Sequence, residues 1–184
     1  MRNDMVNIVI LLVLAIGVYS GARRGLILQA VHMAGYVVTL LIASTFYSSL
    51  SKTLEMIVPY PSDTTASAFS LYNLLKNVQF DKTFYNALAY VVILFIGWVI
   101  TRIVAATLNK LSRIIVIKQL NTLGGAILGF VCNWIGLYFL FTLLSVVPIQ
   151  SIQDVFSGTS FATFIVQHTP IISDIIMKTW LAYV

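Results

Sequence analysis

Five polar side chains lie inside otherwise apolar segments of the chain and are its main candidates for chemistry. They are Gln29, His32, Arg102, Asn109 and Asn133. Polar groups surrounded by hydrocarbon are costly, and they mark solute pathways, proton relays or interhelical hydrogen bonds. Arg102 lies near the end of its apolar segment, so we expect its guanidinium to extend to the lipid headgroups rather than act as a buried functional charge.

His32 and Asn133 stand at similar predicted depths in the membrane. Counted from the nearest basic connection at about 1.5 Å per residue, both lie roughly 10 to 15 Å deep. The two side chains can therefore meet as an intramembrane polar pair. A satisfied interhelical hydrogen bond is the favoured interpretation, and a polar pair lining a small cytoplasm-facing crevice is the alternative.

Other chemistry is not indicated by the residue pattern. The single cysteine, Cys132, lies within an apolar run, which excludes an intramolecular disulfide and a CxxC site. His32 and His168 fall on opposite sides of the predicted membrane, so no nucleophile has a credible base. The chain contains no HExxH, Walker loop or GxGxxG after a strand. The sequence therefore predicts no enzyme, no cofactor and no metal site.

The composition requires a lipid environment. Hydrophobic residues make up 59% of the 184 residues and charged residues only 9%, more apolar surface than a water-soluble core could bury. The net charge of +5 comes from thinly spread Lys and Arg that flank apolar runs, as in membrane loops, which argues against nucleic-acid binding. We therefore expect an all-α membrane protein with the lipid bilayer as its solvent.

Four segments approach the roughly 20 apolar residues that a helix needs to cross a bilayer. They are residues 6–20, 26–50, 87–108 and 123–147. The first is short, and it either crosses fully, which we favour, or forms a re-entrant hairpin with the second. A cleaved signal peptide is disfavoured because Arg23 and Arg24 directly follow the apolar stretch without an A-x-A site.

Basic residues in two connections set the predicted orientation. Arg23 and Arg24 follow the first span, and the third span is followed by Lys110, Arg113 and Lys118 with no acidic residue among them. Both connections therefore belong on the cytoplasmic side, where these residues act as topology and lipid anchors. This orientation places the N- and C-termini outside the cytoplasm.

Glycines recur at helical spacing in the predicted spans. Two glycine ridges have a spacing of four residues: one is Gly17, Gly21 and Gly25, and the other is Gly125 and Gly129. Two further glycines are Gly35 in the second span and Gly136 in the fourth. Such small-xxx-small ridges let helix backbones approach closely in lipid. We expect the first, second and fourth spans to be neighbours in one compact four-helix bundle, and the same ridges to be candidates for a homo-oligomer contact.

Two segments outside the spans carry amphipathic patterns and are expected on the extracytoplasmic side. In residues 51–83, Leu71, Leu74, Leu75 and Val78 predict an interfacial helix. In residues 149–184, short apolar faces form around Phe156, around Phe161, Phe164 and Ile165, and around Ile172, Ile175 and Ile176, with Thr159 or Ser160 able to cap the middle helix. These helices either lie on the outer leaflet or, as we favour, fold over the bundle.

Several stretches together resemble one known family. "GARRGLILQAVHMAGY" and "LIASTFYSSL" are similar to the first block of the colicin V production (CvpA) family of small bacterial inner-membrane proteins. "QLNTLGGAILGFV" (residues 119–131) resembles that family's Asn-x-x-x-Gly-x-x-x-Gly entry to the fourth helix, and the tail "IQDVFSGTSFATFIVQHTPIIS" resembles Gram-positive members. Thr122 and the stretch "GFVCNW" depart from the pattern, since many members carry a basic residue there.

The resemblance implies a multi-pass protein of the bacterial cell membrane that is associated with colicin V production or export and with envelope integrity. Some relatives carry an extracytoplasmic trypsin-like protease domain after the last helix, which agrees with the C-terminus placed outside by charge. We therefore expect a non-enzymatic accessory or scaffold protein that binds an envelope or secretion protein on the extracytoplasmic side. The alternative is a small transporter or channel subunit with a polar crevice near His32 and Asn133.

Overall fold

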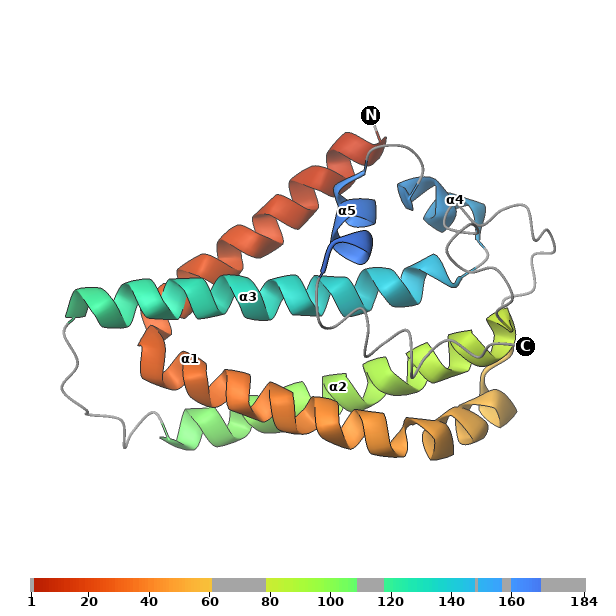
Figure 1. Cartoon of the computed structure of the whole chain (residues 1–184), viewed down its shortest axis with the longest axis horizontal. Helices are drawn as coiled ribbons and strands as arrows, with labels where there is room; N and C mark the ends of the chain where they lie inside the picture. Colours follow the sequence, from red (N-terminus) through yellow and green to blue (C-terminus); the bar gives the residue numbers. More distant parts are fainter. Residues whose placement is uncertain (1, 61–78, 109–117, 148, 157–159, 170–184) are drawn as a thin grey trace.

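The structure, a computed structural model, describes residues 2–60, 79–108, 118–147, 149–156 and 160–169 (Figure 1). All regular structure in these residues is helical: α1 (Arg2–Ile57), α2 (Phe80–Leu108), α3 (Lys118–Ser145), α4 (Gln150–Gln153), the 3₁₀ helix η3 (Asp154–Phe156) and α5 (Phe161–Gln167). Three of these helices, α1, α2 and α3, are long and apolar enough to cross a membrane. The predicted all-α membrane class is confirmed at this level.

Helix α1 is bent into two parts. Its 56 residues would make a rod about 84 Å long, more than twice the roughly 30 Å of a bilayer core. Gly25 interrupts it with φ 79° and ψ 169°, and Figure 1 shows the chain turning back there into a V. We call residues 2–24 α1a and residues 26–57 α1b. The break coincides with the predicted connection between the first two spans.

The observed helices run beyond the predicted span boundaries. α1b continues to Ile57, α2 begins at Phe80 and α3 begins at Lys118, whereas the predicted spans ended at residue 50 and began at residues 87 and 123. The prediction stopped at polar residues. A helix keeps its own backbone hydrogen bonds after it leaves hydrocarbon, so polar residues such as Lys52 and Asp81 extend it without cost.

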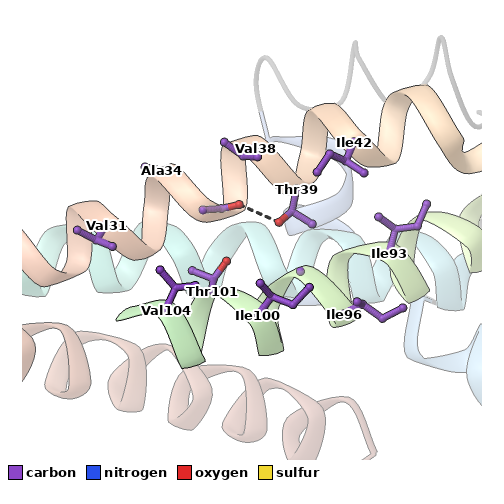
Figure 2. A pocket seen from close by; sticks show the side chains of 12 residues that line it. Val31, Ala34, Val38, Thr39, Ile42, Ile93, Ile96, Ile100, Thr101 and Val104 are labelled. Carbon is purple, nitrogen blue, oxygen red and sulfur yellow. Dashed lines mark hydrogen bonds between the residues drawn. The ribbon is translucent and has the colours of Figure 1, made fainter. Parts of the chain in front are cut away.

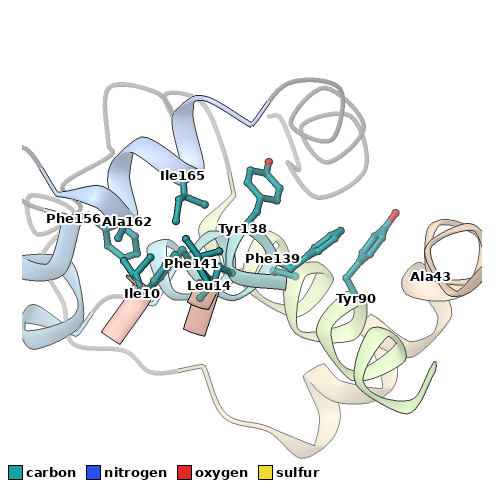
Figure 3. Close-up of a cluster of buried hydrophobic side chains, with 12 residues drawn as sticks. Ile10, Leu14, Ala43, Tyr90, Tyr138, Phe139, Phe141, Phe156, Ala162 and Ile165 are labelled. Atoms are coloured by element: carbon teal, nitrogen blue, oxygen red, sulfur yellow. The ribbon is translucent and has the colours of Figure 1, made fainter. Parts of the chain in front are cut away.

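The hydrophobic core lies along α3, and the other helices pack against it there. The most extensive packing is between α1 and α3, followed by that between α1 and α2. Buried side chains from α1, α2, α3, η3 and α5 meet in one cluster, which Figure 3 shows with its labelled members Ile10, Leu14, Ala43, Tyr90, Tyr138, Phe139, Phe141, Phe156, Ala162 and Ile165. Large aromatic side chains of α3 therefore fill the centre of the bundle.

An aromatic contact closes the end of the α1b–α2 pair. The hydroxyl of Tyr85 donates to the carbonyl oxygen of Val58 at 2.8 Å, and the rings of Tyr60 and Phe84 meet edge to face with centroids 5.4 Å apart. Burial raises the pKa of the Tyr60 hydroxyl above its ordinary value, and Asp81 and Tyr85 add to the shift. The Tyr60 hydroxyl therefore stays uncharged at neutral pH.

Helix α5 folds back into the bundle, as the favoured interpretation of the tail predicted. α5 lies in the angle between α1a and α3 (Figure 1), and its residues Ala162 and Ile165 are fully buried. Ser160 caps it by accepting from Ala162 N at 3.2 Å, and Asn7 Oδ1 on α1a accepts from Phe161 N at 3.2 Å. The first N–H groups of this short helix are thus satisfied by protein, which burial in a membrane protein requires.

The tip of α5 reaches the middle of α3. Trp134, halfway along α3, donates its indole N–H to Thr169 Oγ1 at 3.0 Å, and Thr169 in turn donates to Ile165 O at 2.6 Å. At the other end of the segment, buried Gln153 donates to Ser145 O and Val147 O at 3.0 and 2.8 Å. These bonds satisfy orphan carbonyls at the end of α3, so the chain re-enters the bundle without unpaired backbone at those points.

Replacing Ile165 with alanine is expected to release α5. Ile165 is 0% exposed, and truncation of a buried isoleucine costs about 2 to 5 kcal/mol because of the cavity left behind. Proteolytic cleavage of the detergent-purified protein within residues 160–169 should become several times faster. Gln167→Ala, at an exposed position of the same helix, is the matched control. Equal protection in both variants would contradict the docking role of Ile165.

Two predicted helices and two predicted anchors lie outside the described residues. The helices are those over residues 71–78 and 172–176, and the anchors are Lys110 and Arg113.

Candidate functional site

The two glycine ridges pack against each other within one chain. A Cβ added at Gly21 would collide with the carbonyl oxygen of Gly125 and lie 2.9 Å from Gly129 Cα. A Cβ at Gly129 would collide with Gly17 O and lie 2.9 Å from Gly21 Cα. All four glycines are buried, and backbone therefore touches backbone where α1a crosses α3. We call this contact the glycine seam.

The seam bears on one interpretation of the sequence. Gly17, Gly21, Gly125 and Gly129 are covered inside a single chain, so these ridges serve packing within the protomer, and a homo-oligomer contact stays a prediction. Gly136 differs from the prediction, since a Cβ added there would meet nothing within 4 Å. α1a and α3 diverge beyond the point where they cross (Figure 1), and Gly136 is exposed.

Gly35 packs against α2 rather than α3. A Cβ on Gly35 would collide with Thr101, and one on Gly97 would collide with Thr39. The two helices thus exchange a reciprocal glycine–threonine contact. Thr39 Oγ1 donates to Gly35 O at 2.8 Å (Figure 2), so its hydroxyl is satisfied within α1b and its methyl faces Gly97.

Asn121 clamps the break in α1. Its Oδ1 accepts a hydrogen bond from Leu26 N at 2.8 Å across 95 residues of sequence. Leu26 begins α1b, so Asn121 serves as an N-cap supplied by another helix. The Asn121 side chain also lies against Gly25 and would collide with a Cβ added there. Sequence reasoning noted this asparagine only as part of a motif, and its spacing of four from Gly125 was the available signal.

His32 and Asn133 do not bond to each other. His32 Nδ1 lies 2.7 Å from Leu28 O, its hydrogen-bond acceptor, and Asn133 Nδ2 donates to Gly129 O at 3.0 Å. Each is thus satisfied by its own helix. Asn133 packs over Gly17 on α1a, while His32 meets the ring of Tyr36 edge-on with centroids 6.3 Å apart.

Gln29 is the least satisfied polar group of α1b. It is only 3% exposed, as is His32, and within the described residues its Oε1 has no hydrogen-bond partner. Its side chain lies beside Cys132, which is half-buried on α3. Gln29, His32, Tyr36 and Cys132 therefore form a small polar cluster between α1b and α3.

Three arginines, Arg23, Arg24 and Arg102, lie at one end of the bundle. Arg23 is exposed with its guanidinium 5.9 Å from the Tyr19 ring centroid, Arg24 is half-buried, and exposed Arg102 stacks over Trp98 at 4.7 Å. The bend of α1, the end of α2 and the start of α3 at Lys118 meet at this end (Figure 1). We call it the basic end.

The described carboxylates lie elsewhere. Asp4 is at the start of α1, Glu55 at the end of α1b, Asp81 at the start of α2 and Asp154 in η3. Among the residues that the structure describes, no group of three or more His, Cys, Asp and Glu side chains could hold a metal ion.

Comparison with known proteins agrees with this architecture. Residues 6–170 match the family model described as colicin V production protein. A relative from Bacillus subtilis (strain 168), the uncharacterized transmembrane protein YshB, is 32% identical over 179 residues, which cover 97% of this chain and 99% of the relative. No solved structure matches. On both grounds the chain belongs to the colicin V production family of membrane proteins.

Proposed function

We propose that the protein is a non-enzymatic accessory or scaffold protein of the bacterial cell membrane that serves toxin production or export and envelope integrity. Its family supports this proposal. The observation that carries it is the glycine seam, because backbone contact of this kind closes the space between α1a and α3. A rigid, closed bundle suits a protein that presents surfaces to partners.

The segment after α3 is the proposed partner surface. It presents exposed Gln150 on α4 and exposed Phe164 on α5, while its buried face holds it to the bundle. A photoreactive residue at Gln150 should yield one defined, saturable protein adduct in living cells. The same probe in Gly129→Leu should lose that adduct, and in His32→Ala should keep it. Adducts with lipid alone in the wild-type protein would refute the scaffold proposal.

We also propose four passes with both termini outside the cytoplasm. The separation of charge supports this orientation, because the basic end carries Arg23, Arg24 and Arg102 and none of the described carboxylates, as the cytoplasmic ends of membrane helices do.

Cysteine labelling tests the orientation. In a Cys132→Ala background, Ser62→Cys and Ser173→Cys should react with a membrane-impermeant maleimide in intact cells. Ala22→Cys, next to the arginines, should react only after lysis and serves as the control. Labelling of Ala22→Cys alone in intact cells would reverse the orientation.

A transport function is the second candidate, and Gln29 favours it. A buried amide oxygen without a partner among the described residues suits a solute site more than a scaffold core. This function predicts pH-dependent flux in liposomes that is lost in Gln29→Leu and His32→Ala. The scaffold function predicts no such flux and tolerance of both changes.

A further inference from the structure

One exposed stripe of α2 combines a cation with two aromatic rings. Phe95, Trp98 and Arg102 are spaced at i, i+3 and i+7 and so share one face. Phe95 is 63% exposed and Trp98 39%, and their rings stack with centroids 5.8 Å apart and 25° between planes. The Arg102 guanidinium covers the Trp98 ring at 4.7 Å. The stripe thus runs from the basic end toward the middle of the helix.

Arg102 stands at the depth of the headgroup boundary. It precedes the last residue of α2 by six positions, or about 9 Å. The 29 residues of α2 make a helix of about 44 Å around a hydrocarbon core of roughly 30 Å, so about 7 Å extends beyond each side. Trp98, one turn deeper, then lies about 8 Å inside the hydrocarbon, beneath the Arg102 guanidinium that covers its ring.

The positive charge at this place is uncompensated. Arg24, half-buried at the bend of α1, and Arg102, exposed near the end of α2, both belong to the basic end. Within the described residues neither guanidinium has a carboxylate partner, since the carboxylates lie in other parts of the fold. Stacking on Trp98 covers one face of the Arg102 guanidinium and leaves its N–H edge available.

We propose that an anionic phospholipid binds along this stripe, with its phosphate on the N–H edge of Arg102 and an acyl chain over Trp98 and Phe95. A planar guanidinium matches a phosphate with two parallel hydrogen bonds. Arg24 supplies a second positive charge to the headgroup. Basic pockets between membrane helices select anionic headgroups in this way. This inference requires only membrane insertion and is independent of the proposed function.

The groove between α1b and α2 lacks these features. It has a volume of about 420 Å³ and its floor is formed by the glycine–threonine contacts (Figure 2). Its walls are apolar side chains such as Val38, Ile96 and Val104, and neither Arg102 nor Trp98 lines it. An acyl chain can fill such a groove, but no charged group there would distinguish one headgroup from another.

Brominated lipids test the proposal, because bromine quenches only tryptophans that it touches. Trp134→Phe/Trp180→Phe leaves Trp98 as the single fluorophore. At equal mole fractions in nanodiscs, brominated phosphatidylglycerol should quench Trp98 more than brominated phosphatidylcholine. Arg102→Gln should weaken that preference about fivefold, the factor that corresponds to about 1 kcal/mol per arginine at a membrane surface. Arg23→Gln, another exposed arginine stacked on a ring, should retain it.

Native mass spectrometry of the chain with all its tryptophans guards against misfolding of the fluorescence variant. The wild-type protein and Arg23→Gln should retain phosphatidylglycerol from a mixture with phosphatidylcholine, and Arg102→Gln should lose it. Equal quenching by the two lipids, or equal loss in both arginine variants, would refute the site. Absence of quenching by either lipid would also refute it and indicate that a second protein surface covers Trp98.

Discussion

Gly129→Leu is expected to prevent α1a from seating on α3 and to leave little folded protein, whereas Gly136→Leu should fold like the wild type. At Gly129 the added side chain meets the backbone of Gly17 and Gly21, which cannot move aside as a flexible side chain can. Overpacking costs about 1 to 3 kcal/mol where neighbours can adjust, and we expect the upper end or more here. Size-exclusion profiles and thermal midpoints in detergent measure the difference.

Gly136 is a close control because it belongs to the same helix and residue type. Nothing lies within 4 Å of a Cβ added there, and Gly136 is exposed while Gly129 is buried. Gly136→Ala should even stabilise α3 slightly, since alanine is favoured over glycine in a helix by up to about 1 kcal/mol. A loss of folded protein at both positions would show that the seam has no special part in assembly.

Gly25→Ala is expected to destabilise the bundle almost as strongly. With φ 79° and ψ 169°, Gly25 occupies a region that is essentially reserved for glycine, and forcing another residue into it costs on the order of 1 to 3 kcal/mol. The new Cβ would also collide with the Asn121 side chain. Unfolding in mixed micelles of increasing SDS content, followed by circular dichroism, gives the free-energy change.

Asn121→Ala tests the other half of the clamp. Loss of a helix cap costs about 0.5 to 2 kcal/mol, and Asn121→Asp, which keeps the accepting oxygen, should recover most of it. Because alanine at position 121 also relieves the collision made by Gly25→Ala, the double variant should lose less than the sum of the two. Strictly additive losses would argue that Asn121 and Gly25 do not act on each other.

The sequence predicted where the long helices lie much better than it predicted which neighbour each side chain faces. Apolar length, glycine spacing and basic residues predicted the long helices and the region of the break, and Ser160, one of the two predicted cap candidates, caps α5. Counting residues from the basic connections placed His32 and Asn133 at the same depth in the membrane. Depth alone does not say in which direction around its helix a side chain points. Each helix turns about 100° per residue, and the structure points the two side chains to separate neighbours.

Contacts between residues far apart in the chain could not be predicted from the sequence for the same reason. The hydrogen bond from Leu26 N to Asn121 Oδ1 joins residues 95 positions apart, and the periodicity of neither helix predicts it. Gly136 lies two helical turns after Gly129 and so on the same helix face, yet a Cβ added there meets nothing within 4 Å. The inclination of two helices decides how far a ridge stays in contact.

The clamp at Gly25 has a consequence for biosynthesis. Asn121 follows Leu26 by 95 residues, so at roughly 5 to 20 residues per second a ribosome adds it about 5 to 20 s later. During that interval the bend in the first helix is without its capping partner. The bend between α1a and α1b therefore acquires its cap only after α3 has been synthesised, so this part of the fold is completed late.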